Sequence, residues 1–130
     1  MIPGHFEHHA PSTVDEAIKL LSEKEDAKIL AGGHSLLPMM KLRFAEPMHL
    51  IDINGVSELK GIREEGGKIY IGAMTTENEL IASELLNQKC PLVPEVARLI
   101  ADPQVRNCGT VGGDVVHGDP GNDHPSTMMA

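Results

Sequence analysis

The chain has 130 residues, which is room for one domain, since single domains typically take roughly 100–200 residues. It carries 11 Lys and Arg against 19 Asp and Glu, a net charge of −8, and only 2% of its residues are aromatic. An acidic chain with so few rings for base stacking is a poor candidate for binding nucleic acid or an anionic membrane surface. No apolar stretch approaches the ~18–20 residues that span a bilayer, so no integral membrane segment is predicted and a cytoplasmic protein is expected.

The first half of the chain predicts a helix and several short strands. A segment with His5, His8 and His9 opens the chain; these histidines could bind a metal, but a solvated segment is the favoured interpretation. The pattern Thr13-Val14-Asp15-Glu16 is typical of a capping box, and the apolar residues that follow at helical spacing predict an amphipathic helix. Strands are predicted at residues 28–31, 49–53, 61–64 and 68–71, the last two forming a β-hairpin. The strand at 28–31 runs directly into Gly32-Gly33, and a helical turn is expected over 36–41.

The second half predicts helices and then a glycine-rich region. A second capping box begins at Thr76 and predicts a helix that continues to Leu86. A third helix is predicted from residue 92 to 101, with Asp102-Pro103 expected to stop it. Beyond Arg106 the composition shifts to Gly, Asp and Asn, and a further helix is expected to start near the end of the sequence. The predicted fold class is therefore α+β, and residues 1–130 are expected to be an incomplete part of a larger domain.

Two glycine pairs offer places for a phosphate group. One lies in the segment 31–36 and the other in the segment 108–114, directly after Thr110. Adjacent glycines allow successive backbone N–H groups to point into one concavity, which suits an anion even without basic side chains. Neither segment matches the P-loop or the Rossmann fingerprint, and a plain tight turn is an equally weighted interpretation for either pair alone. Together the two pairs favour a ligand with two phosphates.

These segments resemble a known family. Residues 31–43, 109–113 and 118–123 are similar to the FAD-binding medium subunits of the molybdopterin dehydrogenase (xanthine oxidase-like) family, in particular those of the aerobic carbon monoxide dehydrogenase type. The resemblance extends to residues 1–4, 71–76 and 100–106 and so covers nearly the whole chain. It implies that residues 1–130 are the N-terminal part of an FAD-binding domain of the vanillyl-alcohol-oxidase (PCMH) type.

The resemblance also implies a cofactor, partners and a role. The cofactor is FAD, and the partners are a large subunit with the molybdenum cofactor and a small subunit with [2Fe-2S] clusters. The chain would pass electrons from those clusters to an external acceptor, while the large subunit oxidises the substrate. No catalytic residue and no metal site is expected in this chain.

Carried over by position, the resemblance implies a set of cofactor-binding residues. The two glycine loops would hold the FAD pyrophosphate through backbone N–H groups and two hydroxyl groups, and one acid would face the ribityl chain. The family usually has Asn at position 114, and a carboxylate near a phosphate would lower the affinity. The residues are Ala31, Gly32, Gly33, His34, Ser35, Thr110, Val111, Gly112, Gly113, Asp114 and Asp123.

Two alternatives stay open. Imidazole and carboxylate groups cluster near the end of the sequence, and such groups are good ligands for divalent metals, so a metal-dependent hydrolase is one alternative. Its centre would consist of His117, Asp119, Asp123 and His124. The other alternative is an assembly module that binds partner subunits without taking up FAD.

Overall fold

A computed structural model describes residues 1–130, which form two compact units. The first unit is Met1–Glu58 and the second is Leu59–Ala130. A short 3-10 helix at Ser57–Leu59 crosses the boundary between them in the sequence.

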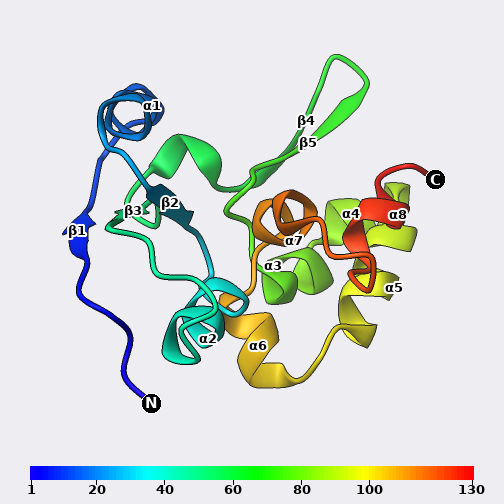
Figure 1. Ribbon diagram of the computed structural model, residues 1–130. Helices are drawn as coiled ribbons and strands as arrows, with labels where there is room; N and C mark the ends of the chain where they lie inside the picture. The colour runs from blue at the N-terminus through cyan, green and yellow to red at the C-terminus, as the bar shows by residue number, and fades with distance from the viewer. The chain divides into compact units, whose positions relative to one another are not determined.

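The first unit is built on a parallel sheet in which β3 (His49–Asp52) lies between β1 (Glu7–His9) and β2 (Ala27–Leu30). The central strand β3 is buried, since Leu50 and Ile51 have no exposed surface. The unit has two helices, one on each side of the strands of this sheet (Figure 1). The elements are β1 (Glu7–His9), α1 (Val14–Glu23), β2 (Ala27–Leu30), α2 (Leu36–Lys41) and β3 (His49–Asp52).

Most of the elements predicted for this unit are confirmed. The helix after Thr13, the helical turn at 36–41 and the strands near 28–31 and 49–53 are all present within one or two residues. Thr13 caps α1 by accepting from the N–H of Glu16, but the Glu16 carboxylate reaches the N–H and hydroxyl of Ser12. The first capping box is therefore only half formed.

The histidine-rich start is largely exposed, as expected of a solvated segment, but it also contains a strand that the sequence does not predict. Residues Glu7–His9 form β1, and they pair with β3 in the register Glu7 with His49 and His9 with Ile51. The side chain of His9 is only 20% exposed. A strand of three polar residues at a sheet edge carries no apolar alternation, so the sequence gives no periodic signal for it.

The second unit begins with a β-hairpin and continues with helices. Strands β4 (Ile62–Glu65) and β5 (Lys68–Ile71) pair antiparallel, and Gly66 and Gly67 form the two-residue turn with φ of +59° and +74°. Positive φ at both central residues is the requirement of a type I′ turn, which glycine meets without strain. The predicted hairpin is confirmed.

A cluster of apolar side chains joins the helices of this unit. Its buried members are Leu80, Leu86, Val93, Ala97 and Val111, and isoleucines of the hairpin pack against it. The helices are α3 (Glu77–Ala82), α4 (Glu84–Lys89), α5 (Leu92–Leu99), α6 (Pro103–Cys108), α7 (Val111–His117) and α8 (His124–Thr127).

The structure differs from the prediction at three points of this unit. The single helix expected from Thr76 to Leu86 is divided at Ser83, whose side chain accepts from the N–H of Leu86 and caps α4. Asp102-Pro103 begins a helix as well as following one, because Asp102 accepts from two N–H groups of α6 and proline fits the first helical position. The glycine pair Gly112-Gly113 lies inside α7 instead of a loop.

The second capping box is complete and generates a prediction about stability. The Thr76 hydroxyl accepts from the N–H of Glu79 (3.3 Å), and the Glu79 carboxylate accepts from the N–H of Thr76 (2.7 Å). Thr76→Ala leaves the N–H of Glu79 without this partner, and we expect a loss of about 1 kcal/mol in the free energy of unfolding. Urea denaturation measures this, with Asn78→Ala as the control because Asn78 is an exposed residue of the same helix. Equal losses in the two variants would contradict the capping role.

Candidate functional site

The first glycine loop carries unpaired backbone N–H groups. Residues 31–35 connect β2 to α2, and Gly33 has φ of +80°. The N–H groups of residues 32–35 donate no hydrogen bond within the protein, while the carbonyls of Gly33 and Ser35 accept from α2. Successive free N–H groups around a residue with positive φ form an anion-binding concavity. The loop therefore has the donors that a phosphate group needs.

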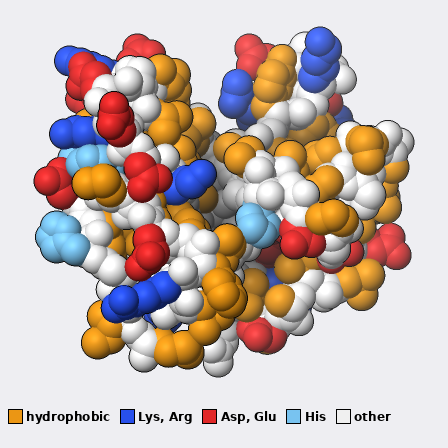
Figure 2. Space-filling model, in the orientation of Figure 1, with side chains coloured by type: hydrophobic (Ala, Val, Ile, Leu, Met, Phe, Trp, Pro, Cys, Tyr) orange, Lys and Arg blue, Asp and Glu red, His pale blue; other side chains and the backbone are white.

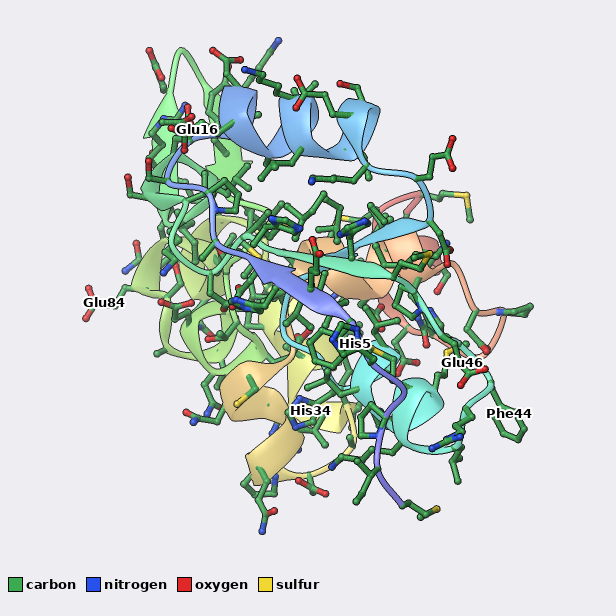
Figure 3. The ribbon with its side chains drawn as sticks, turned by 60° about the vertical axis from the view of Figure 1, so that its left-hand side comes forward. His5, Glu16, His34, Phe44, Glu46 and Glu84 are labelled. Carbon is green, nitrogen blue, oxygen red and sulfur yellow. The ribbon has the colours of Figure 1, made fainter.

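The side chains of this loop leave those donors accessible. The His34 ring donates through Nδ1 to the carbonyl oxygen of Gly32 (3.1 Å), so it folds back on its own loop. Figure 3 shows His34 on this segment. Ser35 stands at the start of α2 but makes no capping bond, which leaves its hydroxyl uncommitted. A side chain at Gly33 would meet both the positive φ and Leu37, whose Cδ1 would lie 2.8 Å from a Cβ.

No basic side chain belongs to this loop, so anion binding there depends on the backbone. Residues 31–35 include no Lys or Arg. Figure 2 shows acidic and basic side chains interspersed on the face in view, without a broad area of Lys and Arg. Phosphate recognition by hydrogen bonds from N–H groups is compatible with this surface.

The second glycine pair is organised differently, and this corrects the expectation of a second free nest. The N–H of Val111 donates to Thr75 and that of Gly112 to Ala73, at 3.0 and 2.9 Å. The N–H of Gly113 donates to the Thr110 hydroxyl (3.2 Å), which caps α7. These N–H groups are already used by the fold, so they are not free donors like those of the first loop.

Gly112 is required by packing. A Cβ at this position would lie 2.6 Å from both the Cβ and the carbonyl oxygen of Ala73. Such distances are far inside van der Waals contact, so only glycine allows α7 to approach the segment before α3 this closely. A glycine pair is typical both of an anion-binding loop and of a close contact between two backbone segments. The sequence alone therefore does not distinguish these two roles for Gly112-Gly113.

Asp114 organises the segment that follows α7. Its Oδ2 accepts from the N–H of His124 (3.1 Å), and its carbonyl oxygen accepts from the Asn122 side chain (3.0 Å). The carboxylate is therefore engaged inside the protein. Asp123 is exposed, and its side chain caps nothing at the start of α8.

A buried ion pair lies close to these residues and was not identified from the sequence. His124 Nε2 lies 2.8 Å from Glu77 Oε2, and the two side chains are 0% and 2% exposed. The Nδ1 atom of His124 is buried without a hydrogen-bond partner. Glu77 lies in the helix predicted from Thr76, and no local pattern links it to His124, which is far away in the chain.

The pKa of His124 is raised by its surroundings. Burial by itself acts to lower this pKa, because it disfavours the charged ring. The hydrogen bond to Glu77 and the negative charges of Glu77, Asp114 and Asp123 act in the opposite direction and prevail. The folded protein thus holds a proton on this imidazole more firmly than the unfolded chain does.

The metal cluster of the hydrolase alternative is not assembled. His124 faces Glu77, and Asp119 Oδ1 accepts from the N–H of Gly121 (2.7 Å) within a local turn. The four side chains at 117, 119, 123 and 124 do not form a group of ligand atoms within metal-binding distance of one another. The metal centre that the hydrolase alternative requires is therefore not formed by these residues.

A nest of free amides at the end of a parallel strand is typical of domains that bind the phosphates of a nucleotide cofactor. Residues 4–130 match the family described as "FAD binding domain in molybdopterin dehydrogenase". The chain belongs to this family.

The relatives and their structures agree with this assignment. The chain is 64% identical over 131 residues to the carbon monoxide dehydrogenase medium chain of Hydrogenophaga pseudoflava, covering 100% of this chain and 46% of the relative. It is 53% identical over 130 residues to the medium chain of Afipia carboxidovorans, covering 99% and 45%. The solved carbon monoxide dehydrogenase of Hydrogenophaga pseudoflava superposes with a TM-score of 0.94 at 67% identity, covering 96% of this chain and 44% of the other.

The chain spans about half the length of the relatives it matches. None of its helices has both the length and the apolar character needed to cross a bilayer. The predicted α+β class and the similarity to the N-terminal part of the family's FAD-binding domain are confirmed.

The buried pair predicts a pH-dependent stability. Because the pKa of His124 is raised above its usual value near ~6.5, its contribution to stability is complete below that value and is lost as the pH rises through the folded pKa. We therefore expect the free energy of unfolding, measured by urea denaturation, to fall as the pH increases from about 6 upward. Glu77→Gln retains a hydrogen-bonding group but removes the charge, and it should flatten this dependence.

The control for this experiment is Glu84→Gln. Glu84 is an exposed acid on α4, so its removal should leave the pH dependence unchanged. Figure 3 shows its position. Identical pH profiles for Glu77→Gln and the unaltered protein would contradict the proposed linkage.

Proposed function

We propose that this chain is part of the FAD-binding electron-transfer subunit of a molybdenum-containing hydroxylase of the carbon monoxide dehydrogenase type. Residues 1–130 would be the N-terminal part of its FAD-binding domain. The observation that carries the proposal is the run of free N–H groups at residues 32–35, in a chain that belongs to an FAD-binding family. The relatives named as medium chains of carbon monoxide dehydrogenase support the choice of enzyme.

The first loop would hold part of the FAD pyrophosphate. The N–H groups of Gly32, Gly33, His34 and Ser35 are free to donate, and the Ser35 hydroxyl is uncommitted. Hydrogen bonds to a charged phosphate are stronger than those between neutral groups. Ala31 would belong to this site through its position at the end of β2.

The second loop would contribute in a different way. Its N–H groups from Val111 to Asp114 are satisfied by the protein, and the Thr110 oxygen caps α7. What Thr110 can still offer is its hydroxyl hydrogen, while Gly112 and Gly113 offer a surface without side chains. The exposed carboxylate of Asp123 would face the ribityl chain, whose hydroxyl groups are suitable donors.

The bound flavin would supply the electron chemistry, and the protein would supply binding and orientation. The proposed partners are a large subunit with the molybdenum cofactor, which would choose the substrate, and a small subunit with [2Fe-2S] clusters. Cys90 and Cys108 are free thiols, as is usual in a reducing compartment, and this supports a cytoplasmic complex.

Gly33 provides the test of the first loop. Gly33→Val places a branched side chain at a positive φ and against Leu37, so it distorts the run of free N–H groups. We expect FAD affinity, measured by titration of flavin fluorescence, to fall at least about tenfold, the equivalent of one hydrogen bond to a charged group. Gly66→Val is the control, because Gly66 also has a positive φ but lies at the hairpin tip with nothing within 4 Å of a Cβ.

The outcomes separate the hypotheses. If Gly33→Val stays folded and binds FAD as the unaltered protein does, the assignment of this loop is wrong. If the unaltered protein is folded and takes up no FAD at all, the assembly-module alternative is supported. Circular dichroism of each protein shows whether it is folded.

Asp114 provides a separate test of the second loop. Asp114→Asn removes one negative charge while its side-chain oxygen can still accept from the N–H of His124. If the second loop lies close to the pyrophosphate, loss of this repulsion should raise FAD affinity severalfold, and increasing salt should reduce the difference. Glu84→Gln removes a charge from an exposed site on α4 and should not change the affinity. Unchanged affinity in Asp114→Asn would place this carboxylate away from the phosphates.

A further inference from the structure

Three potential metal ligands converge on one face of the parallel sheet in the first unit. His9 Nε2 lies 3.2 Å from His49 Nδ1, and Glu7 Oε2 lies 3.3 Å from His49 Nδ1 and 3.8 Å from His9 Nε2. The strand pairing explains this convergence. Glu7 is the register partner of His49, and His9 follows Glu7 by two residues, so all three side chains share one face.

The distances match the edges of a coordination polyhedron. Ligand bonds of 2.0–2.1 Å in a tetrahedral site place neighbouring ligand atoms about 3.3 Å apart. Two of the three separations agree with this value within about 0.1 Å, and the third involves Glu7, whose side chain is 59% exposed and free to adjust. The histidine rings are held more firmly, at 20% and 16% exposure.

Hydrogen bonds alone cannot pair all three of these atoms at the same time. His49 Nδ1 can carry one hydrogen or one lone pair in its ring plane, yet it faces both the Glu7 carboxylate and His9 Nε2. If His49 Nδ1 donates to Glu7, it cannot accept from His9, and the reverse also holds. A single cation between the three atoms would satisfy all of them at once.

We propose that Glu7, His9 and His49 form a binding site for a divalent transition metal of the zinc class. Two imidazoles and one carboxylate suit Zn²⁺ and its neighbours in the first row, whereas Mg²⁺ prefers an all-oxygen shell. A fourth position would be open to water, because the site is reached from the exposed side of Glu7. A metal here would connect the edge strand β1 to the central strand β3.

The neighbouring strand positions on the same face of the sheet carry no cation. On the other side of β3, the register partners on β2 are Ala27 and Ile29, both apolar. His8 lies on the opposite face, where its Nε2 is 3.2 Å from Asp52 Oδ2. The three ligands are therefore a separate group, and all of them belong to the first unit, so the proposal does not depend on FAD binding.

Equilibrium dialysis of the untagged protein against Zn²⁺, together with titration by Co²⁺ as a visible-absorbing substitute, tests the site. We expect one metal ion per chain and the intense visible absorption that four-coordinate Co²⁺ gives. His9→Gln and His49→Gln should each lower the affinity at least about tenfold, since each removes one of three protein ligands. Glu7→Gln should weaken binding severalfold without disturbing a buried residue, and Mg²⁺ should not bind.

The matched control is His8→Gln. His8 is a neighbouring exposed histidine on the other face, so its loss should leave the affinity unchanged. The proposal is overturned if Zn²⁺ does not bind to the folded protein. It is equally overturned if His8→Gln lowers the affinity as much as His9→Gln, or if folded Glu7→Gln and His49→Gln bind as the unaltered protein does.

Discussion

The assignment of the cofactor loop depends on which backbone N–H groups the fold leaves free. Each N–H group can donate to a carbonyl of the protein or to a ligand, and a donor already paired has little left to offer. At residues 32–35 the chain turns through a positive φ before α2 begins, and these N–H groups donate no hydrogen bond within the protein. At residues 111–114 the chain enters α7 immediately, and each N–H finds a partner in Thr110 or in the segment before α3.

The difference between local and long-range hydrogen-bond partners also explains which elements the sequence could predict. The helices that begin after Thr13 and Thr76 were found because the cap and the apolar spacing are both local. The helix α7 was missed because Gly112-Gly113 is typical of a loop, and its stability comes from contacts with Ala73 and Thr75, far away in the sequence. The two candidate cofactor loops were located by their glycine pairs and by the resemblance to a family, but the role of each N–H group became visible only with its long-range partners.

Glu77 connects several of the elements that the sequence treats separately. Its N–H donates to the carbonyl of Gly109, and Thr76 pairs with Thr110 in an isolated bridge, so the start of α3 is joined to the start of α7. Its carboxylate holds His124 at the start of α8. Buried charges are costly unless they are paired, and removing one partner leaves the other uncompensated. Glu77 therefore takes part both in joining the starts of α3 and α7 and in holding the proton on His124.

The parallel sheet separates the two proposed ligand sites of the first unit. The free N–H groups follow Leu30, the last residue of β2, whereas His49 and its partner Ala27 are the first residues of their strands. With a rise of about 3.3 Å per residue, three residues of strand place the loop roughly 10 Å further along the sheet than His49. Ligands of open parallel sheets bind beyond the carboxyl ends of the strands, which is where the glycine loop lies. The position of the Glu7, His9 and His49 group, near the amino end of β3, suits a metal that joins two strands and not one that takes part in flavin binding.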